Sequence, residues 1–157
     1  MSNAILELLN PLCVVVDGNF NSSTSVITAI GEKLFTQGYV KDTFIQAAIE
    51  RELVLPTGLP LAGGINAAIP HTEIEHVIKP GLGMAILKDS INFQNMVSPT
   101  DSVAVNLVFL LALDKPKAQI EMLQEVASVL QDPQLVSNLV SQETAEGVIN
   151  CFKNSKK

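Results

Sequence analysis

The chain has 157 residues, of which 47% are hydrophobic and 17% are charged. This composition is sufficient for one well-filled core and excludes wholesale disorder. Sixteen acidic residues against ten basic ones give a net charge of -6, and no Lys or Arg cluster precedes the terminal Lys153, Lys156 and Lys157. Because phosphate-rich surfaces are bound by basic patches, nucleic acid and anionic membranes are poor partners for this chain.

The N-terminal residues lack the basic region of a secretory signal. The longest apolar run, residues 103–113, is shorter than the ~20 residues that a membrane helix needs. Cys13 and Cys151 have neither metal-ligand spacing nor a disulfide framework. We therefore expect a cytoplasmic protein without direct membrane insertion.

The first third of the chain predicts one strand and two helices. The β-branched run 13–16 is typical of a short central strand. Polar residues 21–24 can cap a helix that Gly38 ends, and a second helix should start near Asp42 and place Arg51 in its last turn. The first helix should bury Val26, Ile27, Ile30 and Leu34, and the second Phe44, Ile45, Ala48, Ile49 and Leu53.

The rest of the chain alternates apolar runs with helical patterns. We expect strands at 65–70 and 103–113, and a hairpin or two adjacent strands at 83–87 and 91–93. Asp114 and Asp132, each followed by proline, predict two helix starts, and a last helix is expected near 144–152. The first of these helices should bury Ile120, Leu123, Val126, Ala127 and Leu130. The pattern predicts a single α/β domain over residues 1–157, with three layers and a central mixed sheet flanked by helices.

Residues 51–76 hold the chemistry, because both histidines fall there among prolines and glycines. His71 follows Ala-Ala-Ile-Pro, a short buried strand that Pro70 ends, so its ring should be held at a sheet edge. A neutral imidazole can serve as a nucleophile or base near pH 7. His76 is either an ordinary surface histidine or an accessory residue of the same site.

Other site chemistries fit the sequence poorly. His71 and His76 are five residues apart, which puts them on different faces of a helix or strand, so a metal site is not expected. The glycines of residues 58–64 match no nucleotide-binding fingerprint, and no cofactor is expected. By composition alone Arg51 could be a helix-end cation and Thr57 part of an ordinary turn.

A specific order of motifs favours a role for Arg51 and Thr57 in one functional site. It consists of Arg51-Glu52, Pro56-Thr57-Gly58-Leu59, Ala68-Ile69-Pro70-His71-Thr72, Phe93 and the strand 107–112. From the first strand to the last helix, this order resembles the enzyme IIA proteins of the fructose and mannitol class in the bacterial phosphoenolpyruvate-dependent sugar phosphotransferase system. The Pro-Thr-Gly-Leu-Pro variant and the segment 71–77 look most like the galactitol branch.

The resemblance implies the roles of four residues. His71 is the phosphorylated histidine, modified at Nε2, and the family's arginine and hydroxyl residue fall on Arg51 and Thr57. By their chemistry, both side chains can donate hydrogen bonds to the phosphoryl oxygens. Gln119 stands where mannitol-type members have a second histidine, so it is either an amide partner in the site or an exposed helix residue. The amide could donate a hydrogen bond to a phosphoryl oxygen without titrating near pH 7.

The implied activity is that of a phosphocarrier needing neither nucleotide nor metal. Phosphorylated HPr would be the donor and a cognate enzyme IIB the acceptor, during uptake of a sugar or sugar alcohol such as galactitol. Leu59, Leu61 and Ile65 would then form a partly exposed docking surface. The alternative is a regulatory phosphoprotein of the same fold, in which phosphorylation of His71 changes partner binding.

Overall fold

The structure is a computed structural model, and it describes residues 4–155. Its sheet has five strands in the order β1-β4-β5-β3-β2. Their bounds are β1 Leu9–Val15, β2 Gly58–Leu59, β3 Asn66–Ala68, β4 Gly81–Gln94 and β5 Ser102–Ala112. β1 runs parallel to β4 and β3 parallel to β5, whereas the β4–β5 and β2–β3 pairs are antiparallel, so the sheet is mixed as predicted.

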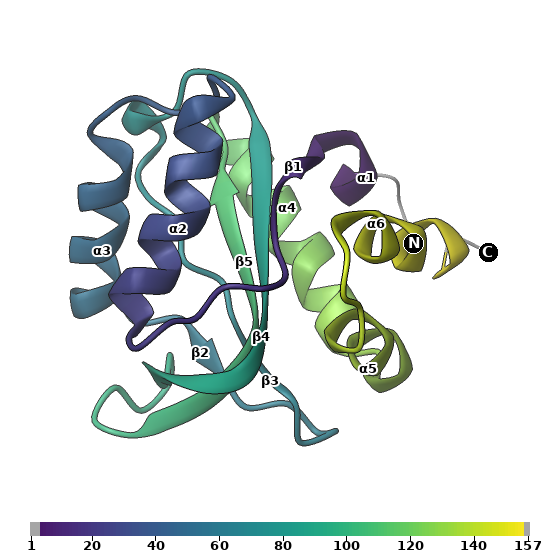
Figure 1. Ribbon diagram of the computed structural model, residues 1–157. Helices are drawn as coiled ribbons and strands as arrows, with labels where there is room; N and C mark the ends of the chain where they lie inside the picture. Colours follow the sequence, from purple (N-terminus) through teal and green to yellow (C-terminus); the bar gives the residue numbers. More distant parts are fainter. Residues whose placement is uncertain (1–3, 156–157) are drawn as a thin grey trace.

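Helices cover both faces of this sheet (Figure 1). One face carries α2 (Ser23–Thr36) and α3 (Phe44–Val54). The other carries α1 (Ala4–Leu8), α4 (Pro116–Leu130), α5 (Pro133–Val140) and α6 (Ala145–Ser155). The three-layer α/β prediction is therefore confirmed. No helix within residues 4–155 has both the length and the apolar composition needed to cross a membrane.

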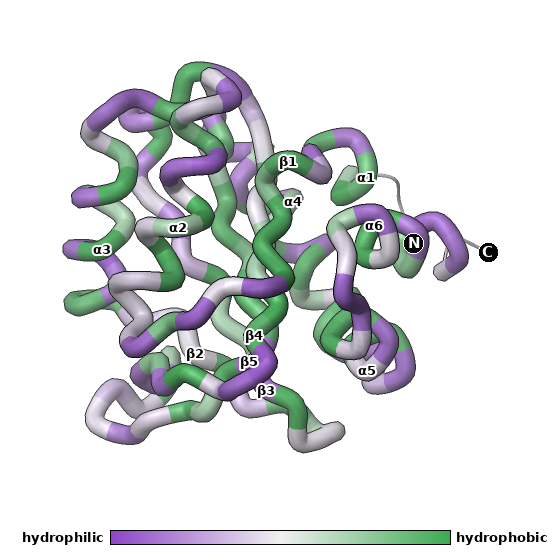
Figure 2. The backbone as a smooth tube through the Cα atoms, viewed as in Figure 1, coloured by the Kyte–Doolittle hydropathy of each residue, from purple (hydrophilic) through white to green (hydrophobic). Residues whose placement is uncertain are grey.

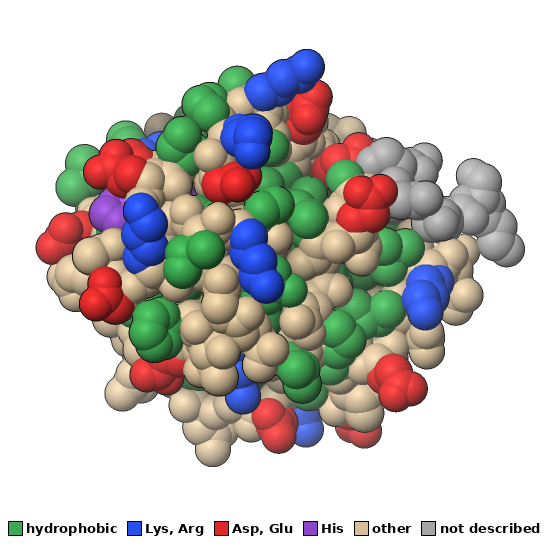
Figure 3. Space-filling view, turned by 90° about the horizontal axis from the view of Figure 1, so that it is seen from above, with side chains coloured by type: hydrophobic (Ala, Val, Ile, Leu, Met, Phe, Trp, Pro, Cys, Tyr) green, Lys and Arg blue, Asp and Glu red, His purple; other side chains and the backbone are tan. Residues whose placement is uncertain are grey.

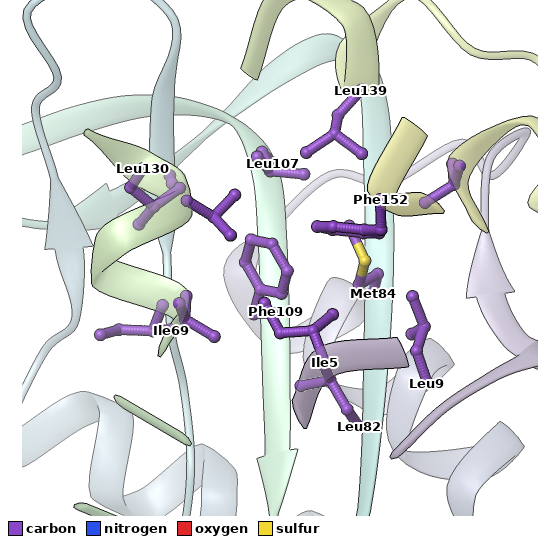
Figure 4. Packing of buried hydrophobic residues seen from close by; sticks show 14 of the residues in the cluster. Ile5, Leu9, Ile69, Leu82, Met84, Leu107, Phe109, Leu130, Leu139 and Phe152 are labelled. Atoms are coloured by element: carbon purple, nitrogen blue, oxygen red, sulfur yellow. The ribbon is translucent and has the colours of Figure 1, made fainter. Parts of the chain in front are cut away.

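Each sheet face has its own hydrophobic core because side chains alternate along a strand. Met84 and Phe109 point into the cluster under α4, α5 and α6, while Ala85 and Val108 point into the one under α2 and α3. Hydrophobic residues concentrate along the central strands (Figure 2). Ile69, just beyond β3, is 6% exposed and its side chain lies in the first cluster (Figure 4).

Several helix ends follow the predicted chemistry. Ser22 caps α2 through a reciprocal pair of hydrogen bonds with Ser25. Gly38 follows this helix with a φ of 83°, a left-handed conformation that glycine adopts without strain. Asp132 caps α5 by accepting from the Leu135 N–H, and Arg51 lies in the last turn of α3 as expected.

The prediction of a hairpin or two adjacent strands at 83–93 was wrong. Residues 83–87 and 91–93 belong to one long strand, β4, and both parts pair with β5. The exposed segment 88–90 shifts the register between Ile86 and Ile91 without reversing the chain. A local irregularity on an otherwise continuous ladder accounts for the polar interruption, as in a β-bulge.

Three expected core residues are also corrected. Leu53 is 75% exposed and Ile120 58% exposed, and Ala127 is exposed as well. The buried residues of α4 are Met122, Val126, Val129 and Leu130. The face of α4 is thus rotated relative to the predicted one, because Met122 rather than Ile120 packs against the sheet. The short elements α1 and β2 were not predicted, and β1 begins earlier than the expected 13–16.

Candidate active site

His71 lies three residues beyond the end of β3, directly after Pro70. The Pro70 carbonyl accepts a hydrogen bond from the Leu111 N–H, so this segment stays fixed to the end of β5. His71 is 9% exposed, and its Nδ1 lies 2.9 Å from the Ile69 carbonyl oxygen. A carbonyl oxygen can only accept, so Nδ1 carries the hydrogen and Nε2 keeps its lone pair. His71 thus follows a short buried strand as predicted, but β3 is an inner strand between β5 and β2 and not an edge of the sheet.

The surroundings of His71 keep the ring neutral. Burial lowers the pKa of His71, and the positive charge of Arg51 lowers it further. The hydrogen bond to the Ile69 carbonyl and the charge of Glu73 act in the opposite direction but do not outweigh burial. A neutral imidazole with a free Nε2 lone pair is the nucleophilic form of histidine.

A buried chain of hydrogen bonds leads away from this imidazole. The Ile69 N–H donates to Thr57 Oγ at 3.1 Å, and the Thr57 hydroxyl donates to Glu52 at 2.8 Å. The Thr57 N–H also donates to Glu52, again at 2.8 Å. The hydroxyl hydrogen of Thr57 is therefore directed at Glu52, and Thr57 is linked to His71 through the backbone of Ile69.

Glu52 is the end of this chain and an unusual residue for a helix interior. It is 7% exposed, and burial raises its pKa from the ordinary 4.5 to about 7, although the Thr57 hydrogen bonds and Arg51 act to lower it. Glu52 is part of the motif order on which the family resemblance rests, but no role was predicted for it from the sequence. The available signal was a carboxylate three and seven residues after two apolar positions of α3, Ile49 and Ile45, on the inward face.

Arg51 and Glu73 form the solvent-facing part of the site. Arg51 Nη1 lies 2.7 Å from Glu73 Oε2, and the two side chains are 28% and 53% exposed. The Nε of Arg51 is buried and has no hydrogen-bond partner among the described residues. The guanidinium therefore has donor capacity beside His71 that Glu73 uses only in part. Glu73 was also missed by the sequence analysis.

A shallow pocket of about 710 Å³ adjoins this ion pair, between α3 and the short 3-10 helix Ile74–His76. Arg51, Glu73 and His76 contribute to its lining, but His71 does not. His76 Nδ1 lies 2.8 Å from the Thr43 hydroxyl. The two histidines thus have separate partners. Within the described part of the chain no group of three or more His, Cys, Asp or Glu side chains could hold a metal ion.

Gln119 lies in the first turn of α4 and is half-buried. It stands three and seven residues before the buried Met122 and Val126, so it continues the inward stripe of that helix. α4 begins shortly after β5, the strand to which the Pro70 carbonyl is bonded. This position is at the same end of β5 as His71, and a direct role of Gln119 stays a prediction.

Exposed and half-buried apolar side chains lie on several elements of the structure. Leu59, Leu61 and Ile65, expected as docking surface, are half-buried and pack against the core cluster on the α4 side. Val54 and Leu55 at the end of α3 are exposed instead, as are Met96 and Val97. Met96 is tied to β2 by its N–H, which donates to the Gly58 carbonyl. On the face seen in Figure 3, basic side chains are scattered singly among acidic and hydrophobic ones.

Comparison with known proteins identifies the family of the chain. Residues 7–155 match the family described as phosphoenolpyruvate-dependent sugar phosphotransferase system, EIIA 2. The galactitol-specific EIIA component of Escherichia coli K12 is 33% identical over 123 residues, 78% of this chain and 81% of that protein. The mannitol-specific enzyme IIA component of Staphylococcus aureus N315 is 26% identical over 152 residues, 95% of this chain and 97% of that protein.

A solved structure shares the fold. The complex of the mannitol enzyme IIA with phosphorylated enzyme IIB from Escherichia coli contains a chain that matches with a TM-score of 0.74 and 20% identity, over 94% of this chain and 99% of that one. The family match spans nearly all of the described residues and includes every element of the site. The chain therefore belongs to the EIIA 2 family, and is a component of the phosphoenolpyruvate-dependent sugar phosphotransferase system.

Proposed function

We propose that this chain is a single-domain, cytoplasmic phosphocarrier that takes a phosphoryl group from phosphorylated HPr onto His71 Nε2 and passes it to a cognate enzyme IIB. The observation that carries this proposal is the hydrogen bond from His71 Nδ1 to the Ile69 carbonyl. It leaves a neutral ring with the Nε2 lone pair available, as in-line attack on phosphorus requires.

In the transfer step, the Nε2 lone pair forms the new N–P bond while the bond between phosphorus and the donor breaks. The electron pair of that bond stays with the donor. His71 keeps its Nδ1 proton, so the product ring is positively charged and remains bonded to the Ile69 carbonyl. The transition state is loose and places charge on the peripheral oxygens, so alignment and electrostatic stabilisation supply most of the catalysis.

Arg51 provides that stabilisation in this proposal. Its guanidinium can offer two parallel N–H groups to the phosphoryl oxygens, provided that Nη1 exchanges the Glu73 carboxylate for the incoming phosphoryl group. Thr57 supports the site through Ile69, and the Gln119 amide supplies a neutral donor. His76 is proposed at most as an accessory residue, because its Nδ1 is bonded to Thr43.

Purified phosphorylated HPr and a galactitol-type enzyme IIB test this function directly. We expect wild type and His76→Ala to be labelled at one acid-labile site and to pass the phosphoryl group onward. His71→Ala should take no label. A labelled His71→Ala protein would contradict the proposal. Labelling of wild type without transfer to any sugar-alcohol enzyme IIB would favour the regulatory alternative.

A further inference from the structure

The feature that the proposed mechanism leaves unexplained is the buried carboxylate of Glu52. It is 7% exposed at the end of α3, next to the half-exposed Arg51. Moving an ionised carboxylate out of water is costly unless hydrogen bonds compensate. Both of its oxygens accept hydrogen bonds, and both come from Thr57, through the backbone N–H and the hydroxyl. The Glu52 carboxylate therefore orients Thr57, and its two hydrogen bonds are made to neither solvent nor Arg51.

The directions of these hydrogen bonds follow from their donors. The Ile69 N–H must donate, so Thr57 Oγ accepts from it. The ionised Glu52 carboxylate can only accept, so the Thr57 hydroxyl donates its hydrogen to Glu52. The acceptor oxygens of Glu52 therefore determine how the Thr57 hydroxyl is oriented. The Thr57 hydroxyl oxygen in turn accepts the hydrogen bond of the Ile69 N–H, with 3.1 Å between Ile69 N and Thr57 Oγ.

Ile69 transmits this restraint to the nucleophile. Its side chain lies in the core beside α4 (Figure 4), and its carbonyl holds His71 Nδ1 at 2.9 Å. The next residue, Pro70, is held through its own carbonyl by the Leu111 N–H. The backbone that carries the His71 acceptor is thus fixed by the core, by β5 and by the Glu52–Thr57 pair. Only the last of these fixed points contains a titratable side chain.

We propose that Glu52 is a positioning residue for phosphoryl transfer, which acts through Thr57 and the Ile69 backbone to hold His71 in its Nδ1–H form with Nε2 free. This inference rests on the proposed function, since it gives Glu52 a part in presenting the same nucleophile. Glu52 touches neither His71 nor the phosphoryl group in this account.

Four variants separate positioning from general damage. Glu52→Gln keeps the size but offers one acceptor oxygen for two Thr57 donors. Thr57→Val removes the hydroxyl that joins Glu52 to Ile69, and Thr57→Ser keeps that hydroxyl. Glu50→Gln removes one negative charge from the exposed face of the same helix, where Glu50 accepts a hydrogen bond from Gln46, and serves as the charge-matched control.

The decisive readout is the tautomer of His71, measured by 15N–1H correlation spectra of the unphosphorylated protein at about pH 8. We expect the Nδ1–H form in wild type, Glu50→Gln and Thr57→Ser, and a mixture of both tautomers in Glu52→Gln and Thr57→Val. Transfer from phosphorylated HPr should slow about tenfold in the two variants with mixed tautomers. Thr57→Ser should restore most of the rate that Thr57→Val loses.

A folded Glu52→Gln with wild-type tautomer and wild-type transfer rate would overturn the inference. If Glu52→Gln does not fold, the Thr57→Val and Thr57→Ser pair decides, and equal tautomer ratios in those two would likewise overturn it. The tautomer measurement needs no donor. A tautomer shift in a protein that phosphorylated HPr never labels would therefore refute the proposed function while leaving the positioning role intact.

Discussion

Two neighbouring residues at the end of α3 divide the site into halves of opposite character. Glu52 points inward to a closed set of hydrogen bonds that reaches the His71 Nδ1 through Thr57 and Ile69. Arg51 points outward to a half-exposed Glu73 and keeps a buried Nε without a partner among the described residues. In the proposed transfer, the inner half positions His71 as the nucleophile, whereas the outer half holds the Arg51 cation in an exchangeable ion pair.

The difference fits the demands of phosphoryl transfer between proteins. The nucleophile must be aligned before the donor arrives, and a fully satisfied buried network provides such alignment. The cation must instead accept phosphoryl oxygens and release them to the next protein. An exposed ion pair contributes roughly 0 to 1 kcal/mol, so the phosphoryl group can displace Glu73 at small cost.

Removing the cation should give the largest loss of transfer. Arg51→Ala is expected to slow transfer from phosphorylated HPr about a hundredfold, because a charge-stabilising donor is lost. Arg51→Lys should fall between this variant and wild type, since lysine keeps the charge but not the planar fork. Rapid-quench measurements of both variants test this order. Wild-type rates in Arg51→Ala would reduce Arg51 to a helix-end cation.

The titration of Glu52 in the inner half should make the free energy of unfolding depend on pH. The folded pKa of Glu52, about 7, lies above its ordinary 4.5, so its contribution to stability is fully present below pH 4.5 and is lost as pH rises through 7. The expected loss in the free energy of unfolding is roughly 3 kcal/mol. His71 acts oppositely, because its lowered pKa costs stability as pH falls below 6.5.

Denaturant unfolding of His71→Ala and of the double variant His71→Ala/Glu52→Gln at matched pH values isolates the Glu52 contribution, because neither protein contains the titrating group of His71. The difference in unfolding free energy between them should change by roughly that amount between pH 4.5 and pH 8. A pH-independent difference would mean that Glu52 titrates normally in the folded protein.

Among the hydrogen bonds and ion pairs of residues 4–155, none joins the Gln119 side chain to either half, so its variant sharpens the boundary of the site. Gln119→Ala should slow transfer several-fold with little change in stability, since one neutral hydrogen bond contributes roughly 0.5 to 1.5 kcal/mol. Equal rates for this variant and wild type across pH 6 to 8 would place Gln119 outside the site.

The smallest effect is expected for Glu73. In Glu73→Gln the competing carboxylate is gone, so Arg51 can bind the phosphoryl group without displacing an anion. The equilibrium with phosphorylated HPr should move roughly threefold toward the phosphorylated chain. Mixing experiments at fixed donor ratio give this equilibrium directly. A shift away from the phosphorylated chain would show that Glu73 assists phosphoryl binding rather than competing with it.

Local patterns explain which parts could be predicted. The strand end at His71, the position of Arg51 in a last helical turn and the caps at Gly38 and Asp132 depend on residues close in sequence. The burial of Glu52 could not be predicted from such local patterns. Its partner Thr57 lies beyond the helix, and helical periodicity favoured the apolar Leu53 for the inward face. The continuity of β4 depends on its long pairing with β5.

In the site too, contacts between segments distant in sequence could not be predicted. The family resemblance could indicate His71, Arg51 and Thr57 as site residues, but not that the Thr57 hydroxyl is committed to Glu52 or that Arg51 is paired with Glu73. Both contacts join segments whose relative placement is set by tertiary packing. The signal that remained was the acidic character of residues 52 and 73 beside the motif residues.

In the proposed transfer, the inner half presents one particular nitrogen of one particular histidine, Nε2 of His71. The most direct test is a 31P–15N correlation spectrum of the wild-type chain phosphorylated by HPr, with selectively labelled histidine. We predict a single phosphorus resonance coupled to Nε2 of His71, whose Nδ1 still carries a hydrogen. Phosphorus coupled to Nδ1 of His71, or to either nitrogen of His76, would contradict the account.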